Sequence, residues 1–168
     1  MKCKVSGGYS FSKQIPNGYK LYVGIIEDPR LAMIAQVLVQ GGQTVIPEKF
    51  FDVIPELHHH FGVDSYSESF ELFDIPERNF LEATVEEYSY SWNRDFNLYL
   101  KQSRSIYSAL NMLGATIKDQ MQLVIQYHNW IKDGYIMTEF KERTGGDPRP
   151  LINTGHMLHS IDYKVVAL

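Results

Sequence analysis

Hydrophobic and polar positions along this chain follow two periods, and each period predicts a different element. In the stretch YKLYVGIIED, the apolar residues Leu21, Val23 and Ile25 occupy every second position. This period of two, together with β-branched and aromatic residues, predicts a strand. Gly24 within the stretch predicts either a bulge or a close backbone contact.

The next stretch, EDPRLAMIAQVLVQGG, carries the period of a short helix. Asp28 is a suitable N-cap, and Pro29 suits the first helical position because no backbone donor is needed there. Gly41 and Gly42 predict the end of this helix. Its apolar stripe consists of Leu31, Ile34, Ala35 and Leu38. The alternative is that QVLVQ pairs as a strand.

The clearest helical pattern runs from about residue 103 to about residue 131. Its apolar face is formed by Ile106, Leu110, Leu113, Ile117, Met121, Val124, His128 and Ile131. These residues advance by three or four positions, which keeps them on one side of a helix. We therefore expect this face to pack against a sheet. Gly114, which costs about 1 kcal/mol relative to alanine, predicts a close helix crossing or a bend.

A second helix is predicted just before the long one, from about Phe80 into the region 98–100. Its acidic residues Glu82, Glu86 and Glu87 complement the positive end of the helix dipole. They could be drawn as an acid and base pair, but a solvated helix face accounts for them.

Three other segments carry weaker patterns. Residues 1–18 contain the turn signal PNG and are expected to form a flexible arm or a loosely held first strand. Residues 43–73 are interrupted by prolines, a glycine and DSYSES, which indicates an insertion or a long loop. The stretch YIMTEFKERTGGDPRP is interpreted as a loop with at most one strand in it.

The final stretch, RPLINTGHMLHSIDYKVVAL, combines a turn with a strand. A structural turn is predicted at Pro150, Asn153, Thr154 and Gly155. Glycine supplies the left-handed backbone that the corner needs, and asparagine can bond its own backbone. Residues 157–160 form either one helical turn or the start of a strand. The alternation after them predicts a closing strand beside the first one.

This order of elements predicts an α+β fold, with an antiparallel sheet packed against one long and one or two shorter helices. The 168 residues show no internal repeat, so we expect a single domain over residues 1–168. The 11 tyrosines and 9 phenylalanines suit a partner surface or half-buried strand positions. The stretch YSYSW, for example, could contact a partner or pack between helices.

Charge and cysteine content narrow the class of protein. A formal net charge of −4 argues against a general nucleic-acid binder. Cys3 is the only cysteine, which excludes an internal disulfide and a cysteine-based zinc site. The first residues lack the apolar run of a signal peptide, and no stretch has the length of a membrane span. We therefore expect a soluble protein that is made or assembled inside a cell.

Histidines are the most tempting metal ligands. His58, His59 and His60 are consecutive, and neighbouring side chains diverge in regular structure, so they cannot all face one ion. His156 and His159 would share a helical face, but that spacing alone is a weak signal. The sequence also lacks a phosphate-binding glycine loop, a dinucleotide fingerprint and a nucleophile elbow. We predict no metal, no cofactor and no enzymatic activity.

Three segments together resemble the virion-morphogenesis proteins of tailed bacteriophages, the small tail-completion and head–tail joining (neck) proteins. The final stretch is similar to the family pattern PLIDTGxLxxSIxYxV. Asn153 replaces the usual aspartate, and His156 and Leu158 stand where basic residues are often found. The matching positions include Pro150, Leu151, Thr154, Gly155, Ser160, Ile161 and Tyr163.

The other two segments precede this one in the order that the family has. DIPERNFL is similar to the family's IPxRPFL, with Asn79 in place of the second proline. Its matching positions are Ile75, Pro76, Arg78 and Phe80. KLYVGIIED resembles the family's first strand. Residues 43–73 have no counterpart in the pattern.

The resemblance implies a non-enzymatic structural subunit that assembles as a homo-oligomeric ring between portal and tail. The implied partners are further copies of the chain, a portal or connector protein, and a tail terminator or tail tube protein. DNA would pass through the ring without sequence-specific binding, and no membrane would be involved. The implied location is the head–tail junction of a virion assembled in the host cytoplasm. The alternatives are a small histidine-based metal-dependent enzyme and a host-directed binding module.

Overall fold

The structure is a computed structural model that describes residues 3–6, 10–15, 18–45, 53–54, 72–147, 149–152 and 155–168. The described strands are β1 (Cys3–Ser6), β2 (Ser10–Ile15), β3 (Tyr19–Ile25), β4 (Gly42–Val45), β5 (Leu72–Ile75) and β6 (Ile161–Ala167). The described helices are α1 (Pro29–Gln40), α4 (Phe80–Ser103), α5 (Ile106–Tyr127), α6 (Tyr135–Thr144) and α7 (His156–His159). The fold is α+β, as predicted.

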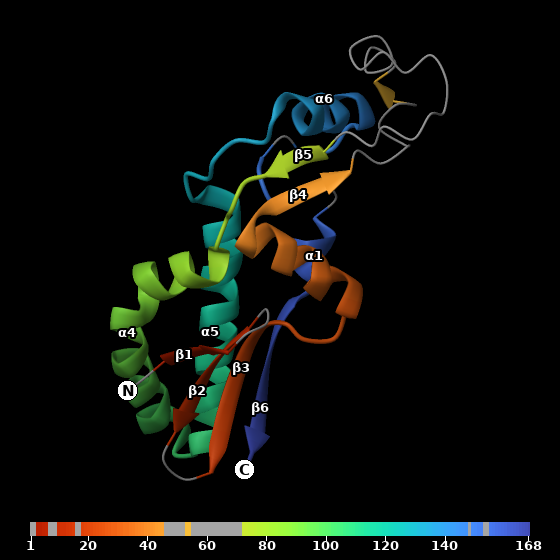
Figure 1. Cartoon of the computed structure of the whole chain (residues 1–168). Helices are drawn as coiled ribbons and strands as arrows, with labels where there is room; N and C mark the ends of the chain where they lie inside the picture. The colour runs from red at the N-terminus through yellow and green to blue at the C-terminus, as the bar shows by residue number, and fades with distance from the viewer. Residues whose placement is uncertain are drawn as a thin grey trace.

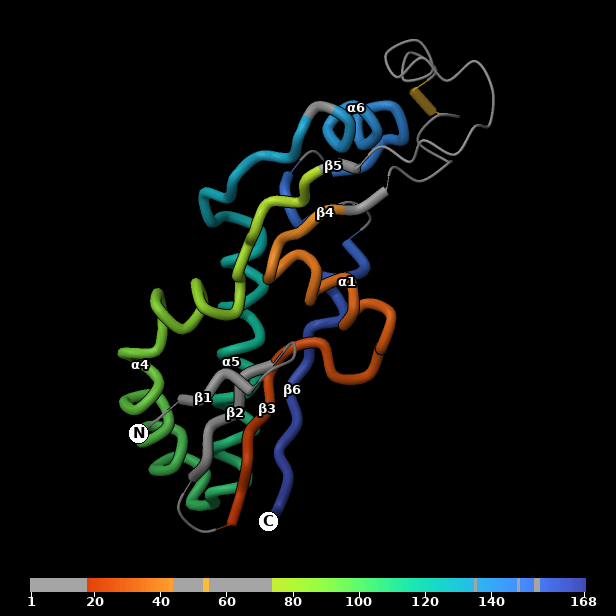
Figure 2. Tube along the Cα trace, in the orientation of Figure 1, coloured from red at the N-terminus to blue at the C-terminus, as the bar shows by residue number. Residues whose placement is uncertain are grey.

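The larger sheet is antiparallel and has the strand order β1-β2-β3-β6 (Figure 1). The closing strand β6 lies beside β3 as predicted, and Val23 pairs with Tyr163 (Figure 2). Gly24 pairs with Ser10 on one side and Asp162 on the other without a break in register. The predicted bulge is therefore absent. β4 and β5 form a separate antiparallel pair.

Helix α1 begins and ends where the sequence predicts. The Asp28 carboxylate accepts hydrogen bonds from the backbone N–H groups of Arg30 and Leu31, at 2.9 and 3.0 Å. Gly41 ends the helix with a φ of 66°. The strand alternative for QVLVQ is therefore wrong. One stripe residue is also misplaced, because Ile34 is 50% exposed and Ala35 is fully buried.

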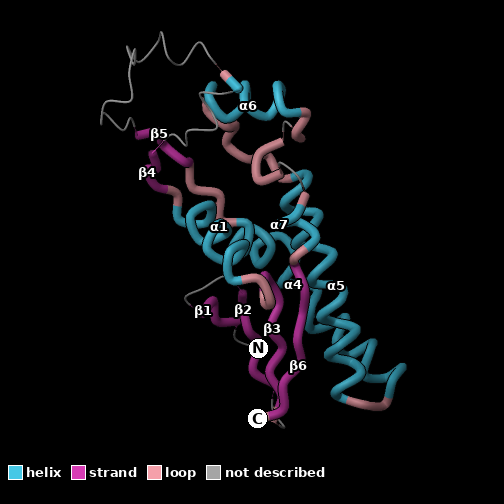
Figure 3. Tube along the Cα trace, turned by 90° about the vertical axis from the view of Figure 1, so that its right-hand side faces the viewer, coloured by secondary structure: helices cyan, strands magenta, loops and turns pink. Residues whose placement is uncertain are grey.

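Helices α4 and α5 pack side by side, and α5 lies against one face of β3 and β6 (Figure 3). The predicted sheet-facing residues Leu110, Leu113, Ile117 and Val124 are all buried in the core. The charged Glu82, Glu86 and Glu87 are exposed, as expected of a solvated helix face. None of the helices in the described ranges is both long and apolar enough to cross a membrane.

Helix α5 is shorter than its apolar repeat predicts. It ends at Tyr127 because His128 adopts an extended backbone, and the indole Nε1 of Trp130 donates to the carbonyl of Val124 at 3.2 Å. This bond occupies a carbonyl of the last turn and turns the chain away from the helix axis. His128 and Ile131 are consequently exposed, and their assignment to the buried face was wrong.

Three segments with weak sequence patterns contain regular structure, and for residues 1–18 the strand alternative is the one that holds. In the predicted arm, β1 and β2 extend the sheet beyond β3. The predicted insertion begins with β4, while most of it lies outside the described residues. The predicted loop after α5 contains α6, which ends in a left-handed Gly145, and the N–H of Gly146 donates to the carbonyl of Lys141 at 2.8 Å. The glycine pair thus marks a helix C-terminus.

Gly114 allows a close approach between α5 and the sheet. A Cβ atom added to this glycine would lie 2.8 Å from Cγ of Tyr163, closer still to its Cδ2, and 3.0 Å from Cδ1 of Leu21. Because Cγ is held near the backbone of β6, the ring cannot swing away freely. The sequence predicted a close helix crossing or a bend at Gly114, but the close approach is between α5 and the sheet.

Gly114→Ala is expected to destabilise the protein by about 1–3 kcal/mol, because the overpacking outweighs the better helix propensity of alanine. Urea unfolding monitored by circular dichroism measures this loss. Tyr163→Ala should be costly in the wild-type background and much less so in the Gly114→Ala variant, since the clash is then relieved. Additive effects of the two changes would contradict the contact.

Candidate functional site

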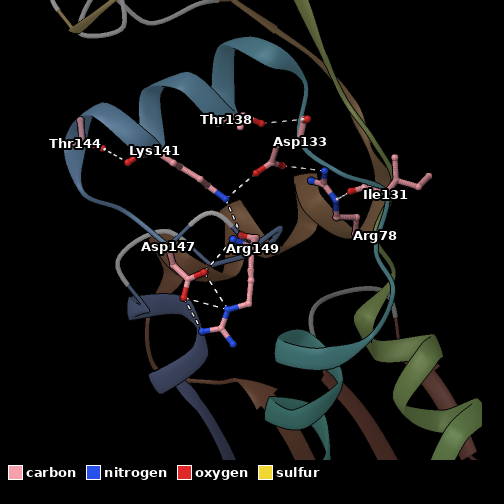
Figure 4. Close-up of polar contacts among 8 residues, drawn as sticks. All are labelled: Arg78, Ile131, Asp133, Thr138, Lys141, Thr144, Asp147 and Arg149. Atoms are coloured by element: carbon pink, nitrogen blue, oxygen red, sulfur yellow. Dashed lines mark hydrogen bonds and ion pairs between the residues drawn. The ribbon is translucent and has the colours of Figure 1, made fainter.

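Arg78 is a buried cation placed between β5 and α4. It is 2% exposed, and its backbone N–H donates to the carbonyl of Leu38 at 2.8 Å. Its Nε donates to the carbonyl of Ile131 at 2.8 Å (Figure 4). These bonds connect the end of α1, the start of α4 and the segment after α5 through one residue.

Asp133 pairs with two cations. Its Oδ1 lies 2.8 Å from Nη2 of Arg78, and its Oδ2 accepts a hydrogen bond from Nζ of Lys141 at 2.6 Å. Lys141 is 3% exposed and also donates to the carbonyl of Arg149 at 2.8 Å. We call Arg78, Asp133 and Lys141 the buried charge network (Figure 4).

The buried charge network holds two cations and one anion. Nη2 of Arg78 is in ion-pair contact with Asp133 but is not aligned for a hydrogen bond, so this nitrogen has no hydrogen-bond partner among the described residues. Taking charges out of water costs several kcal/mol per ion before their mutual attraction is counted. The network therefore depends most on Asp133, the one anion that offsets both buried cations.

A second ion pair lies beside the network at the surface. Nε of Arg149 donates to both carboxylate oxygens of Asp147, at 2.9 and 3.1 Å, and Nη2 lies 2.5 Å from Oδ2. The side-chain hydrogen bonds from Arg149 lower the pKa of Asp147 from 3.8 to about 2, against the opposing effect of desolvation. The same bonds raise the pKa of Arg149.

The predicted turn is described only in part. Gly155 has a φ of 77°, which confirms the left-handed corner, and Pro150 is half-buried. Asn153 and Thr154 lie outside the described residues. Leu151, which the sequence assigned only to a motif, is buried with a positive φ of 63°.

The residues that match the family pattern lie in different parts of the structure, some in the core and others near the ends of helices. Phe80 and Ile161 are fully buried, and Tyr163 lies against Gly114. The hydroxyl of Ser160 donates to the carbonyl of Met157 at 2.8 Å and closes the short helix α7. Ile75 and Pro76 are half-buried just before Arg78. Arg78 is the motif residue that belongs to the buried charge network.

The histidines do not form a metal site in the described part of the chain. His156 and His159 are both exposed on α7, and no group of three or more potential ligands gathers among the described residues. His58, His59 and His60 lie outside the described residues.

The aromatic stretch YSYSW is divided between the core and the surface, and its role between helices is confirmed by Trp92. Trp92 is 1% exposed, and its Nε1 donates to Oε1 of Gln120 at 2.8 Å, which joins α4 to α5. Tyr90 is 80% exposed, so contact of this residue with a partner stays a prediction.

Sequence reasoning missed Asp133 and Lys141. Both lie in polar stretches, 55 and 63 positions from Arg78. Carboxylates such as Glu77 and Glu82 are far closer to this arginine in the chain, so no local pattern distinguishes Asp133 as its partner.

No protein-family model, curated protein or solved structure matches this chain.

Asp133→Asn is expected to destabilise the protein by about 3–5 kcal/mol, because two buried cations then lack their anion. Lys141→Met should cost less, since it leaves one arginine paired with one aspartate. Asp162→Asn is the matched control. The Asp162 side chain is 52% exposed and pairs with Lys118, so its loss should cost less than about 1 kcal/mol. Equal losses for the two aspartates in urea unfolding at pH 7 would contradict this assignment.

Protonation of Asp147 is expected to cause a small loss of folding stability in acid. Its folded-state pKa of about 2 lies below the unfolded value of 3.8, so its contribution is complete above pH 3.8 and disappears as the pH falls through 2. Because Arg149 is 46% exposed, solvent screening limits this contribution to less than about 1 kcal/mol. The unfolding free energies of the wild type and Asp147→Asn should converge as the pH falls from 3.8 to 2. A difference that stays constant over this range would refute the pairing.

Proposed function

We propose that this protein is a non-enzymatic structural subunit of a tailed bacteriophage. In this proposal it serves as a neck, tail-completion or head–tail connector protein and assembles as a ring between portal and tail. Its partners are further copies of itself, a portal or connector protein, and a tail terminator or tail tube protein. The proposed site of action is the head–tail junction of a virion assembled in the host cytoplasm.

The observation that carries the proposal is the spatial relation of the three family-like segments. Arg78, from DIPERNFL, contacts Asp133, and Lys141 connects Asp133 to the carbonyl of Arg149 beside the final motif. The first family-like strand, β3, pairs along its whole length with β6. Positions as far apart in the chain as Tyr19 and Ala167 thus pair in one structural unit, which favours a shared origin for the three resemblances.

The charge of the chain suits the proposed location. A net charge of −4 gives DNA no general reason to remain bound by release of counterions. DNA that moves through a neck must not be held there, so a mildly acidic ring is compatible with its passage. No membrane contact is part of this proposal.

Inactivating the gene in a phage that encodes this chain is expected to give filled heads and separate tails, because the junction between them is incomplete. Electron microscopy of lysates and plaque counts measure this effect. A plasmid copy of the wild type should restore plaques, as should Asp162→Asn, whereas Asp133→Asn should restore few. Intact, infectious virions in the absence of the protein would refute the proposed function.

A further inference from the structure

Among the described strands, the larger sheet ends at β1 on one side and at β6 on the other, and we call these its two open edges. The edge strand β6 has seven residues and contains no proline. Apart from its pairing with β3, its backbone forms no hydrogen bond with another element of the described chain. A strand of this length with free N–H and C=O groups is a template for another extended segment.

The alternating hydrogen bonds between β3 and β6 show which backbone N–H and C=O groups of β6 remain free. The N–H of Leu168 donates to the carbonyl of Gly18 at 2.5 Å, so this pair directs its backbone groups toward each other. Because the direction alternates along an antiparallel strand, every second residue before Leu168 also bonds to β3. The groups that point to the open side belong to Ile161, Tyr163, Val165 and Ala167.

One ion pair lies near this edge. Nζ of Lys118 on α5 is 3.2 Å from Oδ1 of Asp162 on β6, and the two side chains are 31% and 52% exposed. An exposed pair of this kind contributes at most about 1 kcal/mol and occupies no backbone group. The edge is therefore still able to accept a strand.

The number of strands determines how copies can join. Four strands alternate in direction, so β1 and β6 run in opposite directions. A second copy placed beside the first in the same orientation therefore brings its own β1 antiparallel to β6. Pairing of β6 with another β6 would instead require a twofold axis, which turns the neighbour upside down.

We propose that the open edge of β6 binds β1 of a neighbouring copy, so that the sheet continues from subunit to subunit. This inference rests on the proposed function in one respect. A ring that meets a portal on one side and a tail on the other needs all copies to point the same way. The β1–β6 contact satisfies that need, uses each open edge once and leaves none exposed.

The register follows from the pairing within one copy. Cys3 pairs with Lys13, Lys13 with Leu21, and Leu21 with Val165, so these four positions lie at one level of the sheet. Without a shift between copies, Cys3 of the neighbour lies opposite Val165. Shifts must occur in steps of two residues to keep the two faces of the sheet in place, and one such step brings Ala167 opposite Cys3.

Disulfide trapping in the full chain tests this contact directly. Cys3 is the only cysteine in the sequence. Two strands separate β1 from β6 in one copy, a distance of about 14 Å, so a disulfide between them cannot form within a copy. Val165→Cys and Ala167→Cys place a second thiol at the expected register, whereas Lys164→Cys and Val166→Cys place it on the other face as matched controls.

After oxidation over a range of protein concentrations, Val165→Cys or Ala167→Cys should give a ladder of dimers, trimers and larger species. Mass spectrometry should identify Cys3 joined to the introduced cysteine, with less of this product in the two controls. Adding Cys3→Ser should abolish the ladder. Dimers that persist in the Cys3→Ser background would indicate β6–β6 pairing and overturn the inference.

Two other results would also overturn it. One is that the control cysteines at positions 164 and 166 trap Cys3 as well as those at positions 165 and 167 do. The other is that Cys3 is not trapped at any protein concentration. The two proposals fail separately. A specific ladder together with normal virions in the absence of the gene would refute the phage function but keep the edge contact. A virion defect without the ladder would keep the function and refute the contact.

Discussion

Helix α5 lies this close to the sheet because it lacks a side chain at Gly114. The ring of Tyr163 and a methyl group of Leu21 occupy the space that a Cβ atom would need. Since Leu21 belongs to β3 and Tyr163 to β6, this contact fixes the helix over a pair of strands that are far apart in the sequence. α4 then follows α5, held by Trp92 and by the hydroxyl of Tyr99, which lies 2.8 Å from that of Thr116.

Electrostatics determines the arrangement at the other end of the molecule. There the β4–β5 pair and α6 lie away from the large sheet, with α1 between them (Figure 1). Three charges, Arg78, Asp133 and Lys141, connect the surrounding segments with little contact to water. We infer that this network favours one arrangement of these segments, because a displaced arrangement leaves a charge unpaired. Arg78 brings the segment just before α4 into this network, and Lys141 connects it to the carbonyl of Arg149.

Local signals in the sequence were sufficient for much of the fold. Residues close together in the sequence determine the caps of α1, the alternation in β3 and the repeating face of α5. The end of α5 was missed because it depends on the indole of Trp130. Helix α6 was missed because a short polar helix has little apolar periodicity. In the candidate site, Arg78 was predicted as a motif residue, but the burial of Asp133 and Lys141 depends on distant partners and has no local signature.

The pairing of β3 with β6 also determines the order in which this protein can fold. Val23 and Tyr163 are neighbours in the sheet although 140 positions separate them in the chain. On a ribosome, β3 emerges early and has to wait for residues 161–167, with one side unpaired and with part of the face of α5 uncovered. Contacts of such long range make folding slow, and the waiting intermediate exposes apolar surface. The nascent chain is therefore prone to aggregation for as long as β6 is not available to pair with β3.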